Sequence, residues 1–357
     1  MLALQHATEC RILCARQTRK DGTVVYDEAY LASLEQAVRA ALPVWSLSPG
    51  TDLRLLCISE NATYLAEDPE AGTRLVLRVH RPGYHSEDEI RSELAWIGDL
   101  RASGAVQTPA PVPTRGGDPV CRLDVGGVTR HAVAFEHVPG RTPDETDDLP
   151  AWFRVLGGVT ARIHAHARAW KRPPGFQRKV WDFTTMLGER GHWGQWRDGL
   201  GLDGPGTALL ERATTVIRER LARYGTGPDR FGLVHADLRL ANLLVDQDAL
   251  RVIDFDDCGF SWYAYDFAAA ISFFEHDPIV PALLDAWVEG YRAVAPLAPE
   301  DVAEIQTFMV LRRILLIAWV ASHAETPTAQ AMGVPYTEAA YPLAEAYLSS
   351  HANGRHG

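Results

Sequence analysis

One stretch in the second half of the chain restricts its fold more than any other. Residues 233–257 read LVHADLRLANLLVDQDALRVIDFDD, in which two short apolar segments, NLLVD and LRVIDFD, flank a tight turn. Asp237 and Asn242 stand on the loop before this hairpin, and Asp254 ends its second strand. Because a hairpin brings its two ends together, we expect these three side chains to converge on one point.

The three side chains have the chemistry that phosphoryl transfer from ATP requires. One carboxylate must accept the proton of the acceptor hydroxyl, while an amide oxygen and a second carboxylate hold Mg²⁺. The spacing therefore predicts Asp237 as the catalytic base, Asn242 and Asp254 as metal ligands, and Arg239 as a contact to the transferred phosphate. The alternative is that Asp237 caps a helix and Asn242 fills a turn. This alternative would require the order and spacing of the motif residues and the expected secondary structure to agree by coincidence.

The motif HxDxxxxN, followed by an apolar hairpin and IDFD, resembles that of the aminoglycoside phosphotransferase/choline kinase family. The similarity is to the bacterial branch that includes type II homoserine kinases and the stress-response Ser/Thr kinase group, and it extends over about residues 52–349. It implies an α+β, two-lobed, protein-kinase-like fold with ATP and Mg²⁺ as cofactors, and the same roles for Asp237 and the two metal ligands. It also implies that Asp266, in YAYDFA, braces the catalytic loop and that His235 is structural.

The rest of the chain fits a small β-rich lobe followed by a mainly helical one. Strands are expected within 53–80, a capped helix over 86–104, and a hairpin formed by PVCRLDV and TRHAVAFEHV around two glycines. Two long helices are expected near residues 280–295 and 299–324. The predicted division is an N-terminal helical extension (1–50), a nucleotide-binding lobe (51–138) and a lobe with the catalytic loop, metal site and acceptor-binding helices (139–357).

The family resemblance also implies an ion pair that holds the α- and β-phosphates. Family members place a Lys on the third strand, paired with a helix Glu. The matching residues here are Arg78 and Glu93. Arg keeps the positive charge but has a planar geometry that Lys lacks. The alternative for Glu93 is a position on a solvated helix face.

Two further segments are candidates for nucleotide contacts. The turn ISENATYL lacks the glycines of a GxGxxG loop, but Ser59, Asn61 and Thr63 offer side-chain and backbone donors for phosphate oxygens. A simple hairpin turn is the alternative. The segment FEHVPG lies where the two lobes join, so backbone groups around Glu136 and Val138 are expected to meet adenine.

The acceptor site is defined less clearly by the sequence. Arg312 and Arg313 interrupt the apolar run FMVLRRILLIAWVASHA, where they either bind an anionic group in a cleft or form structural salt bridges. Trp181, Trp193 and Trp196 are expected to pack in the core. Further candidates for lining the acceptor site are Asp256, Asp257, Trp262, Tyr263, Glu275 and His276. Carboxylates and aromatic rings would suit an ammonium group. The alternative is that these residues belong to turns and to the core.

Composition narrows the function further. The formal net charge is −11, so a nucleic-acid partner is not expected. The five cysteines are scattered and predict reduced thiols, and the apolar runs are too short for a membrane span or a signal peptide. These features predict a cytoplasmic protein, as a monomer or homodimer.

The predicted activity is transfer of the ATP γ-phosphate to a hydroxyl of a small molecule such as an amino acid, an amino alcohol or an aminoglycoside-like compound. One alternative is a Ser/Thr protein kinase of the stress-response type, although no long activation segment separates Asp254 from Asp266. The other is a nucleotide-binding pseudokinase, for which the Arg at position 78 is the only support.

Overall fold

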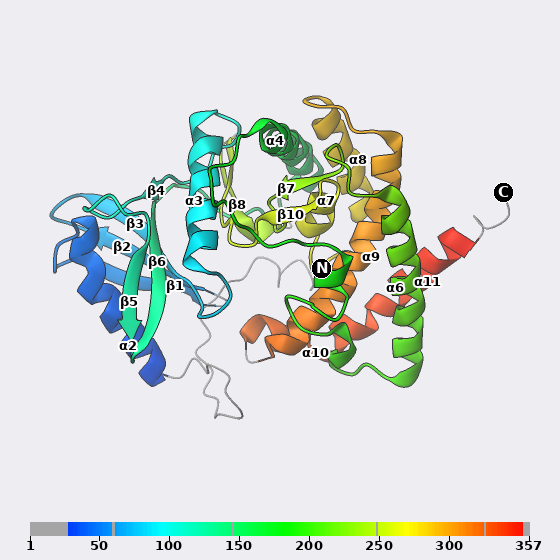
Figure 1. The fold of residues 1–357 in the computed structure, drawn as a ribbon, viewed down its shortest axis with the longest axis horizontal. Coiled ribbons are helices and arrows are strands. Elements are labelled where there is room, and N and C mark those ends of the chain that lie inside the picture. The colour runs from blue at the N-terminus through cyan, green and yellow to red at the C-terminus, as the bar shows by residue number, and fades with distance from the viewer. Residues whose placement is uncertain (1–27, 59–60, 145, 248, 325, 353–357) are drawn as a thin grey trace.

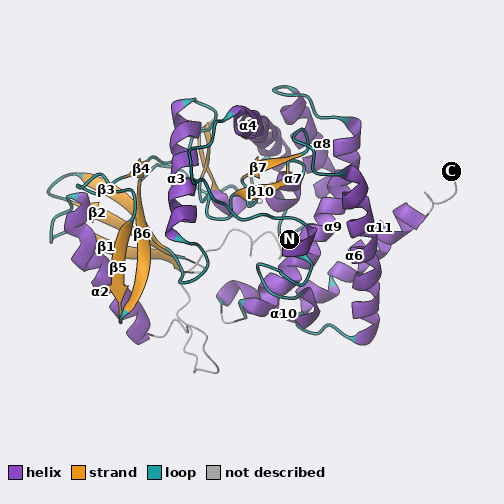
Figure 2. Cartoon of the chain, viewed as in Figure 1, coloured by secondary structure: helices purple, strands orange, loops and turns teal. Residues whose placement is uncertain are grey.

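The computed structural model describes residues 28–352, apart from residues 59–60, 145, 248 and 325. The described chain forms two lobes, with a β-sheet and its helices at one end and a group of helices at the other (Figure 1). Strands gather in the first lobe and helices dominate the second (Figure 2). This arrangement matches the predicted two-lobed α+β fold. Ser59, Cys10 and Cys14 lie outside the described residues.

The sheet lobe is built on one six-stranded antiparallel sheet with the order β1–β2–β3–β6–β4, in which β5 also pairs with β6. Helix α2 packs on it through Leu34 and Val38, and α3 lies between the sheet and the helical lobe (Figure 1). The elements of this lobe are α2 (Glu28–Ala41), the 3-10 helix η1 (Leu42–Trp45), β1 (Asp52–Ile58), β2 (Ala62–Asp68), β3 (Thr73–Val79), α3 (Glu87–Ala102), β4 (Pro111–Val112), β5 (Cys121–Val125) and β6 (Val128–Glu136).

Local sequence signals explain two of these elements. Ser86 and Glu89 form the predicted capping box of α3, each accepting a hydrogen bond from the other's backbone N–H at 3.2 and 2.8 Å. The turn between β5 and β6 holds Gly126 and Gly127 at φ +62° and +83°. Glycine adopts this left-handed region without steric cost, so the hairpin closes in two residues as predicted.

The helical lobe surrounds two small antiparallel pairs, β7 with β10 and β8 with β9. The predicted hairpin after the catalytic loop is β8–β9, and the two predicted long helices are α8 and α9. The elements of this lobe are α4 (Leu149–Ala169), α5 (Phe183–Met186), η2 (Trp196–Asp198), α6 (Gly204–Tyr224), β7 (Phe231–Val234), η3 (Leu240–Asn242), β8 (Leu243–Asp246), β9 (Ala249–Val252), β10 (Gly259–Trp262), α7 (Tyr265–Ala270), α8 (Val280–Arg292), α9 (Pro299–Ser322), α10 (Pro327–Glu338) and α11 (Ala340–Ala352).

Helix α9 forms the centre of the helical lobe. By length and composition it could cross a membrane, so the expectation that the apolar runs are too short for a span is wrong for this helix. Most of it is buried inside the protein, as in the core helix of a globular fold. The same core contains the predicted packing residues Trp181, Trp193 and Trp196, which are all buried. The apolar run in α9 is therefore explained by core packing.

The cysteines differ from expectation. Cys57 in β1 is disulfide-bonded, so the prediction of five reduced thiols is wrong. Cys121 and Cys258 are free thiols. Scattered positions along a sequence do not show which cysteines the fold brings together, and this is why the pattern misled.

The contact between α4 and α8 gives a test of the fold. A Cβ atom at Gly157 would lie 2.1 Å from the Trp287 carbonyl oxygen, whereas one at Gly158 would meet nothing closer than 3.5 Å. We expect Gly157→Ala to lower the free energy of unfolding by about 1–3 kcal/mol, because overpacking forces the helices apart. Gly158→Ala should leave it unchanged or raise it by up to about 1 kcal/mol, since Ala favours the helix. Denaturant titrations giving equal stabilities for the two variants would contradict this packing.

Candidate active site

The catalytic loop between β7 and β8 is fixed by the buried carboxylate of Asp266. Its Oδ1 accepts from the Ala236 N–H at 2.7 Å, and its Oδ2 accepts from the His235 N–H at 3.2 Å. The Nε2 of His164 in α4 lies 2.9 Å from the same Oδ2. Ala236 has φ +66°, a strained conformation for a residue with a side chain. The carboxylate therefore holds the loop in a shape that it would not adopt alone.

The Asp237 carboxylate lies in this loop with three donors around it. Its Oδ2 accepts from Arg239 Nε at 3.1 Å and from Asn242 Nδ2 at 2.7 Å, and its Oδ1 accepts from Arg312 Nη2 at 2.8 Å. Burial alone would raise the pKa of Asp237, but the guanidinium groups of Arg239 and Arg312 outweigh it and hold that pKa below its ordinary value. The carboxylate is therefore ionised at neutral pH and can accept a proton.

Asn242 and Asp254 lie together beside Asp237. The Asn242 amide nitrogen donates to both the backbone oxygen and the carboxylate of Asp237, which leaves Oδ1 of Asn242 as the atom able to bind a cation. The backbone N–H of Ile253 donates to the Asn242 carbonyl at 2.9 Å, so Asp254 is held next to the catalytic loop. The hairpin thus brings the three side chains together as the sequence motif predicts.

The electrostatics of Asp254 fit a divalent cation. The side chain is 41% exposed, but the protein around it displaces water and carries several carboxylates. This desolvation raises the pKa of Asp254 to about 6; Arg78 opposes the shift, and the charges of Asp256 and Glu93 add to it. An ion such as Mg²⁺, which prefers carboxylate and amide oxygens, would neutralise this excess of negative charge. Asn242 and Asp254 are therefore suitable ligands.

Arg78 and Glu93 face each other across the sheet lobe. Arg78 Nη2 donates to both carboxylate oxygens of Glu93, at 2.6 and 2.8 Å, and Nη1 donates to Asp254 Oδ1 at 3.0 Å. The predicted pairing is confirmed, while its role toward a nucleotide stays a prediction. Thr63 is the β2 residue paired with Arg78 in the sheet and is half-buried.

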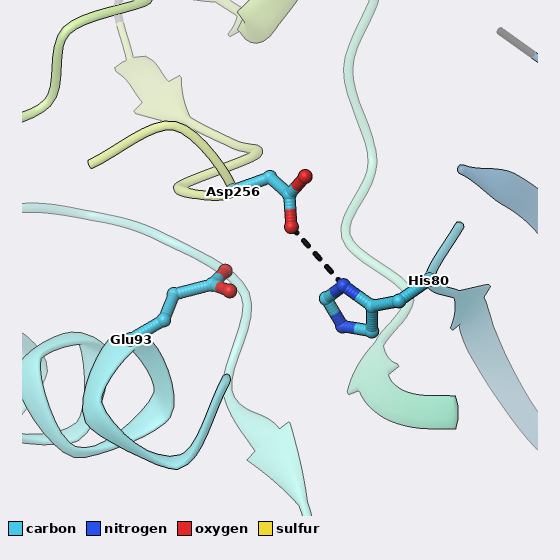
Figure 3. Close-up of side chains that lie close together, drawn as sticks. All are labelled: His80, Glu93 and Asp256. Carbon is cyan, nitrogen blue, oxygen red and sulfur yellow. Dashed lines mark ion pairs between the residues drawn. The ribbon is translucent and has the colours of Figure 1, made fainter. Parts of the chain in front are cut away.

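Glu93 of this ion pair also belongs to a cluster of three buried side chains. His80, Glu93 and Asp256 bring their ligand atoms within 4.8 Å of one another, and His80 Nδ1 lies 3.1 Å from Asp256 Oδ1 (Figure 3). Their composition would suit a metal ion. However, Arg78 already occupies both oxygens of Glu93 and approaches Asp256 to 3.9 Å, so a cation is present in the cluster. Burial also holds the pKa of His80 below its ordinary value. We interpret the cluster as a structural ion-pair network.

The side chain of Asn61, a candidate for phosphate binding, is already hydrogen-bonded within the protein. Asn61 donates to Asp256 Oδ2 at 2.9 Å and accepts from the Arg81 N–H at 3.1 Å. Its side chain therefore ties the start of β2 to the segment after β9. A phosphate contact from Asn61 would have to come from its backbone.

The junction between the lobes is closely packed. Glu136 ends β6, with its N–H bonded to the Ala110 carbonyl at 2.9 Å, and Val138 follows half-buried. At Gly140, φ is +142° and an added Cβ would lie 2.9 Å from the Cβ of Leu244 in β8. Glycine thus lets the connector pass against the catalytic hairpin.

The acceptor candidates separate into two groups. Asp257 is half-buried and accepts from the Tyr84 hydroxyl at 2.5 Å, and Trp193 Nε1 donates to that hydroxyl at 3.2 Å. These side chains lie on the segment that follows Asp254 or pack against it. The others are placed elsewhere: Asp256 is in the ion-pair network, Trp262 and Tyr263 are in the core, Glu275 pairs with Arg313, and His276 is exposed.

The sequence does not distinguish Arg312 from Arg313. Of the two alternatives stated for this pair, a structural salt bridge describes Arg313, which donates to Glu275 at 2.7 Å. Arg312 forms its salt bridge with the Asp237 carboxylate of the catalytic loop, at 2.8 Å. Two arginines inside an apolar run were the available signal, but the sequence does not show which of them faces the loop. His164 carried no comparable signal.

Comparison with known proteins agrees with this geometry. The model of the phosphotransferase enzyme family matches residues 59–300. A solved structure of a microcompartment-associated aminopropanol kinase is 46% identical, with a TM-score of 0.82, and the match covers 88% of this chain and 98% of that one. The amicoumacin kinase of Bacillus subtilis (strain 168) is 26% identical over 275 residues, 74% of this chain and 78% of that protein.

The fold is shared more widely. A structure of the amicoumacin kinase hAmiN in complex with AMP-PNP, Ca²⁺ and Ami is 22% identical with a TM-score of 0.72, covering 89% of this chain and 94% of that one. The two-lobed fold, with the catalytic loop in its helical lobe, is that of the kinase-like phosphotransferases. The chain belongs to the phosphotransferase enzyme family.

Asp266 provides a test of how the loop is held. In Asp266→Asn one carboxylate oxygen becomes an NH₂ group, so at least one of the N–H groups of His235 and Ala236 loses its acceptor. We expect a loss of about 1–3 kcal/mol in stability, together with activity, since each unsatisfied buried donor costs that much. Asp229→Asn, at a 76% exposed side chain, is the control and should stay within about 0.5 kcal/mol of the wild type. An unchanged melting temperature in Asp266→Asn would contradict the bracing role.

Proposed function

We propose that this protein is an ATP- and Mg²⁺-dependent kinase that phosphorylates the hydroxyl group of a small amino alcohol. The observation that carries the proposal is the ionised Asp237 carboxylate, held beside Asn242 and Asp254. A base and two oxygen ligands at one point are what phosphoryl transfer needs from a protein. The 46% identical aminopropanol kinase supports an acceptor of this class.

Each side chain then has a defined task. Asp237 accepts a hydrogen bond from the acceptor hydroxyl and takes its proton. Asn242 Oδ1 and the Asp254 carboxylate hold Mg²⁺, which neutralises charge on the phosphates when bound. Arg239 is partly exposed and bonds to Asp237 through Nε, so its two Nη groups can meet the transferred phosphoryl group while that bond is kept.

The sheet lobe binds the nucleotide in this proposal. Arg78, fixed by Glu93, faces the α- and β-phosphates. Backbone groups at Ser59, Asn61 and Thr63 cover the phosphates, and those around Glu136 and Val138 meet adenine. Use of ATP favours a cytoplasmic location.

An ammonium-bearing acceptor agrees with the surroundings of the catalytic loop. Asp257 offers a half-buried carboxylate beside Tyr84 and the indole of Trp193. The segment between Asp254 and Asp266 is short and is partly taken up by β10, which leaves little chain to build a peptide-binding groove. This favours a small acceptor over a protein substrate.

The proposal is tested by measuring ADP release with amino alcohols, amino acids, choline, aminoglycosides and a generic protein substrate. We expect the highest kcat/KM for a small amino alcohol, and turnover that requires Mg²⁺. Asp237→Asn keeps the side-chain shape but cannot take the proton, so kcat should fall by about 10²–10⁴-fold. A strong preference for the protein substrate, or equal turnover by Asp237→Asn, would contradict the proposal.

Asp254→Asn should differ from Asp237→Asn in nucleotide binding. The base does not touch the nucleotide, so we expect Asp237→Asn to bind ATP with nearly wild-type affinity. Asp254→Asn removes a charged metal ligand and should lose the Mg²⁺-dependent part of ATP affinity, by about tenfold or more. Titration calorimetry with and without Mg²⁺ measures this. Identical binding by the two variants would show that Asp254 is not a metal ligand.

A further inference from the structure

Arg312 makes an unusual set of contacts for a buried residue outside the family-matched segment, which ends at residue 300. Its guanidinium uses all three nitrogens. Nε donates to Ser272 Oγ at 3.0 Å, Nη1 to Tyr265 Oη at 2.8 Å and to the Ala236 carbonyl at 3.4 Å, and Nη2 to Asp237 Oδ1 at 2.8 Å. The residue is only 2% exposed. Its orientation relative to the catalytic carboxylate is therefore fixed from several sides.

The hydrogen bonds at Asp237 leave one oxygen with room for another donor. A carboxylate oxygen has about two lone-pair sites. Oδ2 already accepts from Arg239 and Asn242, whereas Oδ1 accepts from Arg312. The remaining acceptor site is on Oδ1, next to Nη2 of Arg312.

We propose that Arg312 is a positioning residue that directs the acceptor hydroxyl to Oδ1 of Asp237. The inference rests on the proposed kinase activity and deepens it. The hydroxyl donates to Oδ1 and gives up its proton there. The acceptor oxygen forms a bond to the γ-phosphorus of ATP, the bond from that phosphorus to the β,γ-bridging oxygen breaks, and its electron pair leaves with ADP. The proton then passes from Oδ1 to solvent.

The segment between α7 and α8 is shaped to hold this arginine. Ser272 Oγ donates to the Ala269 carbonyl at 2.7 Å, so its lone pairs face Arg312. The next residue, Phe273, has φ +79°, a genuine outlier for a bulky side chain. Its N–H is held by Glu275 Oε1 at 3.1 Å. Backbone strain therefore lies one residue from a contact of Arg312, and retained strain of this kind clusters at functional sites.

Arg313 is a matched comparison within the same helix. It is equally buried and binds the Glu275 carboxylate and the Tyr336 carbonyl, at 2.7 and 2.6 Å. Neither partner belongs to the catalytic loop. Glu275 also accepts from the Phe273 N–H, so changes at Arg313 report the loss of a buried ion pair and reach Arg312 only indirectly. Changes at Arg312 report the loss of a buried ion pair together with the position of Asp237.

The test compares Arg312→Lys with Arg313→Lys in steady-state kinetics with ATP and an amino alcohol. Lysine keeps the charge but cannot reach the four partners at once. We expect Arg312→Lys to lower kcat by about 10²-fold, the cost of a misplaced reacting group, with the KM for ATP within about threefold. Arg313→Lys should keep kcat within about threefold of wild type. Equal kcat values for the two variants would overturn the inference.

A milder pair of variants covers the case in which Arg312→Lys does not fold. Tyr265→Phe removes one support of Arg312, and Tyr336→Phe removes a hydroxyl that donates to the Arg313 partner Glu275. We expect Tyr265→Phe to lower kcat by about three- to tenfold, because one hydrogen bond is worth about 1 kcal/mol. Tyr336→Phe should leave kcat unchanged. Unchanged kcat in Tyr265→Phe, with an active wild type, would refute the positioning role and leave the kinase proposal standing. A wild type inactive with every acceptor would refute both.

Discussion

The ion pair between Arg78 and Glu93 is the interaction on which the geometry of this site depends. It joins β3 to α3, and the same guanidinium reaches Asp254 at the other lobe. Both partners are almost fully buried, so removing Arg78 would leave the Glu93 carboxylate without its ion-pair partner, at a cost of about 3–5 kcal/mol. Asp256 strengthens the connection, since it binds Asn61 and lies against His80. The two lobes are therefore held in register where a nucleotide would lie.

The same charges give the two central carboxylates different properties. Asp237 lies between two guanidinium groups that hold its pKa below the ordinary value, so it is ready to accept a proton. Desolvation, to which the charges of Asp256 and Glu93 add, raises the pKa of Asp254 to about 6 although Arg78 opposes the shift, and a bound cation would favour its ionised form. Neighbouring titratable groups whose environments shift their pKa values in opposite directions are typical of acid–base sites. One loop and one hairpin thus bring together the carboxylate proposed as the base and the two side chains proposed as metal ligands.

The sequence predicted what is local and missed what depends on distant contacts. Asp237, Asn242 and Asp254 lie within one loop and hairpin, so their spacing was sufficient to bring them together. The pairing of Arg78 with Glu93 followed from a family pattern of a strand followed by a helix. In contrast, Arg312 and Asp237 are 75 residues apart, and Asn61 and Asp256 are 195 apart. Only the folded structure shows such contacts, because the sequence contains many other polar residues that could have formed these pairs.

Phosphorus NMR of the reaction products tests the central claim most directly. The wild-type protein is incubated with ATP, Mg²⁺ and aminopropanol. The account predicts ADP and one new phosphate monoester signal, coupled to the proton on the carbon that carries the hydroxyl, because Asp237 activates an alcohol. Formation of inorganic phosphate alone, of a phosphoramidate on the amine, or of no product would contradict it.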